Sequence, residues 1–471
     1  MSIKYKIIFR NLRGFLSQFV RHRVGMFGAF LLSIFLIISI LAPFITEHSP
    51  REWHIAPRMA PPTWVIQGKK APSGIIEVTE SDVRLYKLNR VMNVTVRFKY
   101  DYDLFPSSFS TKIKVKLADV EGIPPELKKV ICVAYLKKPS NTEIPILKVP
   151  KVIEPGAETQ ISISSRSKDL KLFLNSYFNL TVSDPETKVF PAVILFADMD
   201  KSANPYDSDS SVVEKGYYEV IFTFMGYNVI GLEVKETKVQ IEGVTFGLMG
   251  SDGEGRDVWS LLVWGTPIAF AIGVLSSIVS TAFGVIYGII SGYIGGKVDE
   301  VMMRIVDILI AIPKIPILII IAFLYRPSVW TIVLLIGFLG WMGISRVSRS
   351  MCLQFKEMTF VEASKVLGAG KLRIMFRHIL PNILPYAYAS LALGVPDAIL
   401  TEASLSFLGL GDPTAPTWGL ILYWARLDQA FFKGAWWTVI PPGLAIALLS
   451  VSFIFIGHAL NEILNPRIKR L

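Results

Sequence analysis

Long stretches without a charged residue constrain this chain more than any other feature of its sequence. Residues 24–45 form one such run, residues 258–296 form a longer one, and similar runs cover residues 327–345, 379–396 and 435–461. A further apolar stretch, about 304–325, is interrupted by Lys314. A helix needs about 20 apolar residues to cross the hydrocarbon core of a bilayer. The sequence therefore predicts an all-α polytopic membrane core with six transmembrane helices.

The composition agrees with a chain that lies in a lipid bilayer. Of its 471 residues, 52% are apolar and only 18% are charged, which is unusual for a soluble enzyme of this length. The formal net charge is +11, yet residues 47–242 are nearly neutral, with 26 basic and 25 acidic side chains. The basic excess thus belongs to the membrane part, where it sets orientation. It does not indicate a nucleic-acid partner.

Positive charge beside the apolar runs predicts how the chain is oriented. Basic residues precede the first run, and they recur in the loop of residues 346–378 and in the tail of residues 467–471. Because cytoplasmic loops carry an excess of Lys and Arg, we expect a multi-pass protein of the cell membrane with both termini in the cytoplasm. A cleaved signal peptide is the competing interpretation of residues 1–45, but this apolar run is too long for one and lacks a small-residue cleavage site.

The segment after the first apolar run has a different pattern. Apolar and polar residues alternate in short stretches of it, namely residues 93–104, 112–120, 130–136, 159–165, 171–182, 218–225 and 234–244. A period of two is typical of half-buried strands. We therefore predict that residues 46–245 form a β-rich, sandwich-like domain, extracytoplasmic and inserted between the first and second helices. A cytoplasmic segment at residues 1–23, the first helix at residues 24–45 and a membrane core at residues 246–471 complete the predicted domains.

Motifs for catalysis or cofactor binding are missing from the sequence. Residues 292–298 and 368–373 come nearest to a phosphate-binding loop, but both lack its first glycine and the Ser or Thr after its lysine. The five histidines form no His-Glu-x-x-His pair, and no Gly-x-Ser-x-Gly turn occurs. We predict no catalytic residue, no metal site and no cofactor in this chain. A conduit driven by a gradient or by a partner is the better hypothesis.

The basic loop at about 346–381 contains a short stretch that favours a helix. Residues 360–367 can form about two turns, with Thr359 as the N-cap and Glu362 in the first turn, where a carboxylate stabilises the positive helix end. Small residues follow Glu362, which permits close approach to a partner groove. A helix on the membrane surface is the alternative.

Glycines and a proline bound the second half of this loop. Gly368 and Gly370 can end the first helix. Residues 371–380 then alternate basic and apolar side chains at helical spacing. We expect Pro381 to reset the backbone before the next span.

Several blocks of the sequence resemble one transporter family. Glu362-Ala363-Ser364, Gly368 and Leu380-Pro381 resemble the EAA loop of ATP-binding-cassette import permeases. The resemblance is closest to the dipeptide/oligopeptide/nickel permease family. It extends to residues 250–260, 289–313, 402–411 and 465–467, in the order usual for that family. Ser364 in place of the second alanine and His378 in place of an apolar residue depart from the pattern, as does the insert of about 190 residues, whose ligand the resemblance does not supply.

The resemblance implies the partners of this chain and a mechanical role for the loop. It implies a second homologous permease subunit that completes a heterodimeric pore, two cytoplasmic ABC ATPases that use ATP and Mg²⁺, and an extracytoplasmic solute-binding protein. The coupling residues it assigns are Glu362, Ala363, Ser364, Gly368, Leu380 and Pro381. The expected activity is import of peptides or similar oligomeric solutes, with oligosaccharides and nickel-type ligands as alternatives.

Charged residues within or beside the spans are candidates for the translocation path or a gate. Glu300, Arg304 and Asp307 stand at i, i+4 and i+7, so one helix face can carry an ion-pair ladder. Structural pairing and a cytoplasmic gate both remain open for them. Lys314 lies between two prolines inside a span, where a charge is functional by default unless it reaches the interface.

Two more candidates lie near the end of the fifth predicted span. Asp397 and Glu402 precede the glycine-rich, aromatic residues 407–419. A partly re-entrant external loop and an interfacial tryptophan belt are equally good interpretations of that segment.

Two other classes of function compete with the ATP-driven permease. An ion-driven secondary transporter would have an inverted repeat and buried carboxylates near the bilayer midplane, and no such repeat is visible in the sequence. A membrane-anchored receptor or enzyme would keep its activity in residues 50–245. The first class is tested by removing the ATPase partners, and the second by expressing the insert alone.

Overall fold

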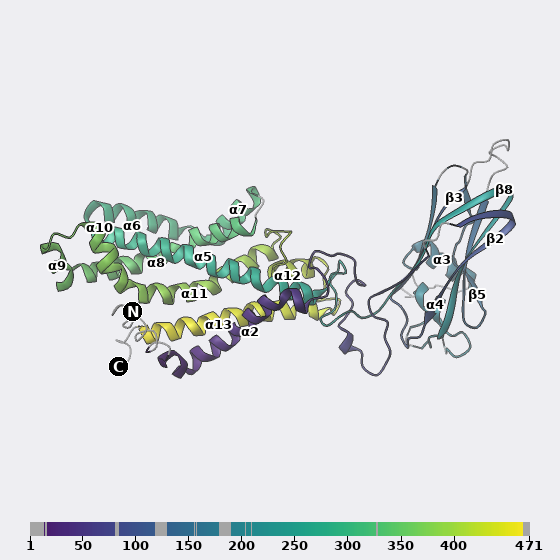
Figure 1. The fold of residues 1–471 in the computed structure, drawn as a ribbon, viewed down its shortest axis with the longest axis horizontal. Helices are drawn as coiled ribbons and strands as arrows, with labels where there is room; N and C mark the ends of the chain where they lie inside the picture. Colours follow the sequence, from purple (N-terminus) through teal and green to yellow (C-terminus); the bar gives the residue numbers. More distant parts are fainter. Residues whose placement is uncertain are drawn as a thin grey trace, which may run out of the picture. The chain divides into compact units, whose positions relative to one another are not determined.

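A computed structural model describes residues 14, 17–80, 84–117, 130–154, 156, 158–178, 190–202, 204–208, 210–325 and 328–464. They divide into two compact units. The helical unit comprises the described residues up to Glu52 and from Val258 onward, and the β unit comprises those of Trp53–Asp257. Figure 1 labels the elements of each unit.

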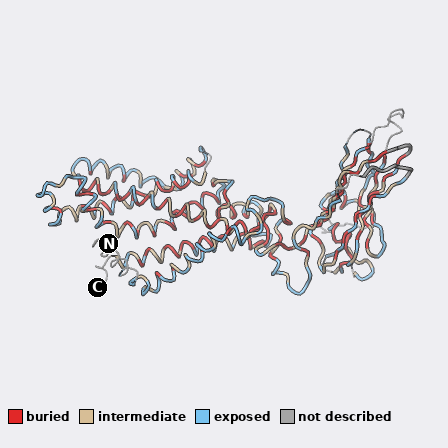
Figure 2. Tube along the Cα trace, in the orientation of Figure 1, coloured by how far each residue is buried: buried red, intermediate tan, exposed pale blue. Residues whose placement is uncertain are grey.

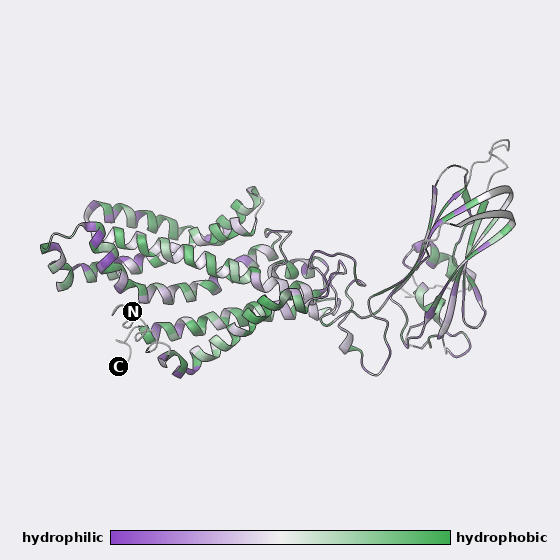
Figure 3. Cartoon of the chain, in the orientation of Figure 1, coloured by the Kyte–Doolittle hydropathy of each residue, from purple (hydrophilic) through white to green (hydrophobic). Residues whose placement is uncertain are grey.

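Helices make up the first unit almost entirely. They are α2 (Arg23–Ile45), α5 (Val258–Ile294), α6 (Gly296–Ala311), α7 (Lys314–Leu324), α8 (Val329–Lys356), α9 (Thr359–Val366), α10 (Lys371–Ile374), a π-helical turn at Met375–Ile379, α11 (Leu380–Phe407), α12 (Trp418–Leu427), a 3-10 turn at Trp436–Thr438 and α13 (Ile440–Leu464). Hydrophobic residues, coloured green in Figure 3, occur along most of the length of these helices.

The described residues contain five helical stretches that are long and apolar enough to cross a membrane. These are Arg23–Ile45, Val258–Ile294, Val329–Lys356, Lys371–Phe407 and Trp436–Leu464. The sixth predicted span is a pair, α6 and α7, bent by 80°. Pro313 is the N-cap of α7, and the preceding Ile312 is extended, with φ −86° and ψ 126°. A proline disfavours helical backbone in the residue before it, which explains the break.

Small residues of α5 let its neighbours approach closely. A Cβ added at Gly284 would lie 2.7 Å from the Trp341 carbonyl oxygen of α8. The hydroxyls of Ser276 and Ser280 donate to the α8 carbonyls of Val333 (3.1 Å) and Gly337 (2.8 Å). Glycine contacts and interhelical hydrogen bonds are the usual means by which membrane helices associate. In Figure 2, buried residues follow α5 and α8, whereas exposed residues gather around α9.

The β unit is an antiparallel sheet with two short helices. Its strands are β1 (Ile75–Glu80), β2 (Arg84–Tyr100), β3 (Ser108–Leu117), β4 (Val130–Lys137), β5 (Glu143–Pro145), β6 (Lys151–Ile153), β7 (Glu158–Ser164) and β8 (Gly216–Glu242), and its α-helices are α3 (Lys168–Tyr177) and α4 (Pro191–Phe196). A 3-10 turn lies at Thr63–Val65.

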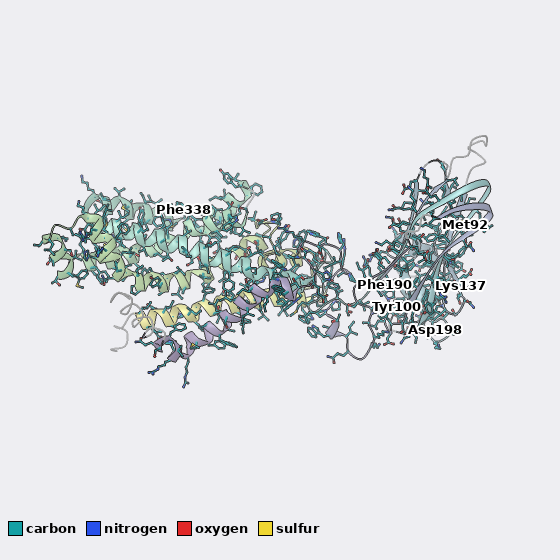
Figure 4. The ribbon with its side chains drawn as sticks, viewed as in Figure 1. Met92, Tyr100, Lys137, Phe190, Asp198 and Phe338 are labelled. Atoms are coloured by element: carbon teal, nitrogen blue, oxygen red, sulfur yellow. The ribbon has the colours of Figure 1, made fainter. Side chains whose placement is uncertain are left out.

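The long strand β8 organises this sheet. One edge of β8 pairs with β2 and then β1, and the other edge pairs with β4 and then β3. All eight strands are therefore hydrogen-bonded into a single sheet, so the β-rich fold predicted for this segment is present, with its strands in one continuous sheet. The buried face carries an aromatic cluster that includes Tyr100, whose ring lies 4.8 Å from that of Phe196 in α4. Tyr100 is labelled in Figure 4.

One predicted strand is wrong. Residues 171–182 alternate in the sequence, but α3 covers Lys168–Tyr177. Ser167 caps this helix by accepting the Asp169 N–H, and Leu170 and Leu174 are buried one turn apart. Helical spacing of these two leucines and a good N-cap outweigh the alternation. The rest of that stretch, from residue 179, lies outside the described residues.

Candidate functional site

The short helix α9 carries three of the predicted coupling residues. Glu362, in its first turn, and Ala363 are exposed, whereas Ser364 is half-buried. The Ser364 hydroxyl donates to the Phe360 carbonyl oxygen (2.8 Å) within the same helix. A serine in place of alanine therefore leaves the helix surface compact and presents no unsatisfied donor. In Figure 1, α9 and α10 lie at one end of the helical unit.

The N-terminus of α9 differs from the prediction. Met358 is the N-cap and makes no side-chain capping bond, and Thr359 is already helical. The chain turns directly from α8, because the Met358 N–H donates to the Phe355 carbonyl oxygen (3.1 Å). A tight connection between the two helices thus replaces the predicted threonine cap.

Gly368 ends α9 by the motif that requires a left-handed residue. Its φ is +78°, its N–H donates to the Lys365 carbonyl oxygen (2.9 Å), and the Ala369 N–H donates to the Ser364 carbonyl oxygen (3.0 Å). These two bonds define a Schellman motif, in which glycine is favoured because it has no Cβ. Gly370 is different: its φ is −66°, and it is the N-cap of α10.

One buried and two exposed apolar residues give α9 an anchor and a tip. Val361 is fully buried in a core cluster that includes Ile289 of α5, Cys352 of α8 and Ile374 of α10. Val366 and Leu367 are 88% and 86% exposed. These two side chains lie outside the core and are accessible on the surface of the helical unit. α9 is therefore a fixed projection with an apolar end.

Leu380 and Pro381 lie at the start of α11, inside one continuous helical stretch. The sequence predicted that Pro381 would reset the backbone, and this is wrong. A π-helical turn at Met375–Ile379 precedes them, in which the Leu380 N–H donates to the Met375 carbonyl oxygen. Proline lacks the N–H that an α-helix needs, and its position in the first turn of α11 after the π turn accommodates this.

Two arginines of α8 hold α6 by its aspartates. Arg349 binds Asp299 at two points, Nε to Oδ1 (2.6 Å) and Nη2 to Oδ2 (2.5 Å). Arg346 binds Asp307 at 2.5 Å. Asp299 is buried and also accepts a bond from the Ser291 hydroxyl of α5. These pairs are interhelical, and sequence reasoning missed Asp299, Ser291, Arg346 and Arg349.

The predicted ladder on α6 is wrong. Among the described residues, no ion pair joins Glu300 to Arg304 or Arg304 to Asp307, and Asp307 pairs with Arg346 instead. The spacing that predicts the observed ion pairs is found only when the sequences of α6 and α8 are compared. Aspartates eight residues apart on α6 meet arginines three residues apart on α8, in antiparallel order.

Lys314 and Asp397, named separately from the sequence, meet in the structure. The Lys314 Nζ donates to the Asp397 Oδ2 (2.6 Å) and lies 3.3 Å from the Thr401 hydroxyl. Lys314 is the first residue of α7, directly after the bend, and Asp397 is in α11. The Asp397 side chain is 67% exposed. An ionised group between membrane helices faces water or a partner and not lipid.

Glu402 lies apart from this pair. It is 4% exposed, and its carboxylate accepts a bond from the Ser406 hydroxyl (2.6 Å) one turn along α11. Gly419 lets α12 approach, because a Cβ there would lie 2.7 Å from the Ser406 Cβ. Glu402 is thus enclosed by side chains of this chain, and its predicted role in the path stays a prediction.

The segment of residues 407–419 folds back onto the core. Asp412 accepts the Val329 N–H at the start of α8 (3.2 Å). Trp418 is 2% exposed and donates to the Leu262 carbonyl oxygen of α5 (2.8 Å). A buried tryptophan of this kind does not form an interfacial belt. The short helix α12 begins at this tryptophan.

The block at residues 250–260 builds a turn over residues 250–257, which belong to the β unit, and then enters α5. The buried Asp252 accepts the backbone N–H of Arg256 (2.9 Å) and binds its guanidinium at 2.6 Å. Gly255 has φ +69° and lies against the Ala56 carbonyl oxygen, where a Cβ would clash. These residues hold the turn in place.

Comparisons with known proteins show which family the chain belongs to. A sequence model described as binding-protein-dependent transport system inner membrane component matches residues 284–470. The dipeptide transport system permease protein DppC of Haemophilus influenzae is 38% identical over 224 residues, which are 47% of this chain and 75% of that protein. The chain belongs to this family of transport permeases. The resemblance predicted from the sequence is confirmed.

Other matches agree with this membership. A model described as the N-terminal TM domain of oligopeptide transport permease C matches residues 11–62 of the permease. Its relatives include DppC and the oligopeptide transport system permease protein OppC of Bacillus subtilis, both 35% identical, over 222 and 223 residues. Each covers 47% of this chain, and the chain covers 69% and 72% of them. Neither family model matches residues 63–283.

Proposed function

We propose that this permease is one of two membrane subunits of an ATP-driven importer of peptides. It supplies half of the translocation path, and a second homologous permease supplies the other half. The names of its relatives, which are dipeptide and oligopeptide permeases, support peptides as the cargo. Two cytoplasmic ABC ATPases use Mg²⁺ and ATP, and an extracytoplasmic binding protein delivers the solute.

The observation that carries this proposal is the fixed projection of α9. Its exposed Val366 and Leu367 offer an apolar contact to an ATPase groove, and the exposed Glu362 offers a charge to a basic group there. Val361 anchors the helix in the core that joins α5, α8 and α10. Closure of the ATPases on ATP then moves α9 and the membrane helices together, because the anchor does not slip.

The path and the orientation follow from the same scheme. With α9 in the cytoplasm, both termini are cytoplasmic, and residues 46–245 lie outside, inserted between the first and second membrane helices. The Lys314 and Asp397 pair, exposed on one side, faces the path between the two permeases. The pair holds α7 against α11 in one state of the conduit and releases it in the other.

Two aspartate substitutions, two residues apart, test the coupling role of α9. Gly368→Asp places a side chain at φ +78° and a carboxylate at the negative end of the helix, and both are unfavourable. Gly370→Asp places the same side chain at an N-cap with φ −66°, which is favourable.

The measurement is ATP hydrolysis by the reconstituted transporter, with and without peptide-loaded binding protein. We expect Gly368→Asp to lower the stimulated rate at least tenfold and Gly370→Asp to leave it within twofold. Normal stimulation in Gly368→Asp, with the protein inserted in the membrane, would refute the coupling assignment.

A further inference from the structure

The strand β7 has a free edge that offers backbone hydrogen bonds. Among the described strands it pairs only with β3. The Ser165 N–H, just beyond β7, donates to the Phe109 carbonyl oxygen (2.8 Å). Because the direction of these groups alternates along a strand, the N–H and C=O groups of Ile161 and Ile163 point to β3. Those of Gln160 and Ser162 point away from it.

The next residue confirms this alternation. The Ser164 carbonyl oxygen accepts the Ser167 N–H (2.9 Å) and so points away from β3. The Ser164 carbonyl oxygen is thus already paired, whereas the outward groups of Gln160 and Ser162 have no backbone partner among the described strands, and such edge groups are a template for another strand. The residues of β7 alternate regularly, with Ile161 and Ile163 buried, and the register of β7 with β3 runs from Glu158 to Ser164 without a bulge.

A hollow of about 480 Å³ lies along this part of the molecule, lined in part by residues 162–164 of β7. Residues 146–149 and Lys151 line it as well, together with Ser167, Asp169 and Leu170 at the start of α3. The lining thus combines edge backbone, apolar side chains and charges of both signs. Such a combination suits an extended chain better than a compact apolar ligand.

Two lysines in the lining of the first hollow have no ion-pair partner among the described residues. Lys148 and Lys151 are exposed and form no ion pair with a described carboxylate. A second hollow of about 290 Å³ shares residues 162–164 and is lined by Lys112 and Lys238. These two lysines are direct partners in the register of β3 and β8. Like charges directly opposite each other destabilise a sheet, and Glu77 already compensates Lys238 (2.7 Å), so an anion here would pair with Lys112.

The anion site has hydroxyl donors as well. Ser110, Ser162 and Ser164 line the second hollow beside the lysines. Lys238 already binds Glu77 (2.7 Å), whereas Lys112 makes no ion pair with a described residue. A carboxylate there would gain the Lys112 ammonium and serine hydroxyls, which are charge-assisted partners.

We propose that the free edge of β7 binds a short peptide as an added strand, with the peptide's C-terminal carboxylate at the lysines around Lys112. This inference rests on the proposed function, because it assigns to the β unit the same class of solute. Backbone pairing does not depend on side-chain sequence, which suits a transporter of varied peptides. Asp169 is the carboxylate in the lining of the first hollow, and it is the partner for the peptide's amino group.

The probe is a pentapeptide of alanines with free termini and a central lysine that carries a fluorescein. It is titrated onto the full-length permease in detergent, without ATPases or binding protein, and followed by anisotropy. Ser162→Pro removes the N–H that points away from β3, at a position where an edge strand tolerates proline. Ser162→Ala keeps that N–H. We expect a rise in Kd of at least tenfold for Ser162→Pro and of less than twofold for Ser162→Ala.

Two changes in the probe test the wild-type permease without any risk to its folding. A peptide N-methylated at alternate residues cannot pair with an edge and should bind at least tenfold more weakly. A C-terminal amide should also bind more weakly, and Lys112→Ala should weaken the free acid but not the amide. Equal binding of the N-methylated and unmodified peptides would overturn the proposal.

The inference and the proposed function fail in different ways. ATP-driven peptide uptake by the whole transporter, without peptide binding to the isolated permease, would overturn the edge site and leave the function standing. Peptide binding at the edge without ATP-driven uptake would support the edge site and refute the function. Binding of the solute-binding protein, lost in Ser162→Pro, without peptide binding would assign the edge to that protein and overturn the peptide assignment.

Discussion

Asp299 of α6 and Arg349 of α8 form a two-point ion pair, with both oxygens of the carboxylate engaged by one guanidinium. The hydroxyl of Ser291 adds a bond from α5, so three helices meet at one carboxylate. Arg349 is two turns before the end of α8, after which the chain enters α9. The pair therefore stabilises the helices on which the projection stands.

Arg349→Ala is expected to destabilise the permease by about 2 kcal/mol, between the values typical of buried and exposed ion pairs. The Asp299 side chain is 13% exposed, so its charge would be left largely without water. Arg346→Ala is the matched control, because Arg346 and Asp307 are each about half exposed and their pair contributes less than about 1 kcal/mol. Thermal unfolding of the two variants in the same detergent measures the difference. Equal losses would contradict the distinction.

The tip and the anchor of α9 are expected to respond to truncation in opposite ways. Val366→Ala with Leu367→Ala removes only exposed side chains, so stability should not change while the affinity for the ATPases falls at least tenfold. Val361→Ala removes two methyl groups from a buried site, which costs about 1 to 2 kcal/mol. Copurification of the ATPases and thermal unfolding separate the two effects. A tip variant that binds the ATPases normally would show that α9 docks by another face.

Much of the helical unit could be predicted from the sequence, because a long apolar run without charges has few alternatives to a membrane helix. The position of α9 was predictable to within one residue, since Gly368 marks its end. The π turn was not, because Pro381 indicates a break and does not show how the preceding turn adapts.

The ion pairs were harder to predict because each joins separate helices. Asp307 has Arg304 nearby in sequence, yet its partner is Arg346, 39 residues away. Lys314 and Asp397 are 83 residues apart, and only the packing of α7 on α11 brings them together. In the β unit, α3 was mistaken for a strand because its leucines fit both periods, and only the cap at Ser167 distinguishes the two.

Lys314→Ala and Asp397→Ala are each expected to lower ATP-driven peptide uptake at least fivefold, because each leaves an unpaired charge between α7 and α11. The exchange of both residues, Lys314→Asp with Asp397→Lys, restores a pair in the same place and should recover at least half of the uptake. Uptake into proteoliposomes of matched protein content is the measurement. If the exchange is no better than the single variants, the sign of the charge on each helix matters more than the pair.

Lys138 of the β unit predicts a dependence of stability on pH. It is 2% exposed, and its Nζ donates to the carbonyl oxygens of Ile194 (3.0 Å) and Ala197 (2.7 Å) at the end of α4. Burial lowers the pKa of Lys138 from 10.5 to about 8, although Glu214 and Asp198 act in the opposite direction. Below about pH 8 the folded and unfolded states are both protonated, and this group adds no slope.

Between about pH 8 and 10.5 the unfolded state keeps a proton that the folded state has released. The free energy of unfolding then rises with pH, by up to roughly 1.4 kcal/mol per pH unit from this group. Lys138→Met lacks the titration, so the stability of the wild type relative to the variant should increase across this window and stay constant below it. Hydrogen exchange in peptides from β4 and β8, compared between the two proteins at each pH, measures this. A constant difference from pH 7 to 10 would show that the buried ammonium keeps its ordinary pKa.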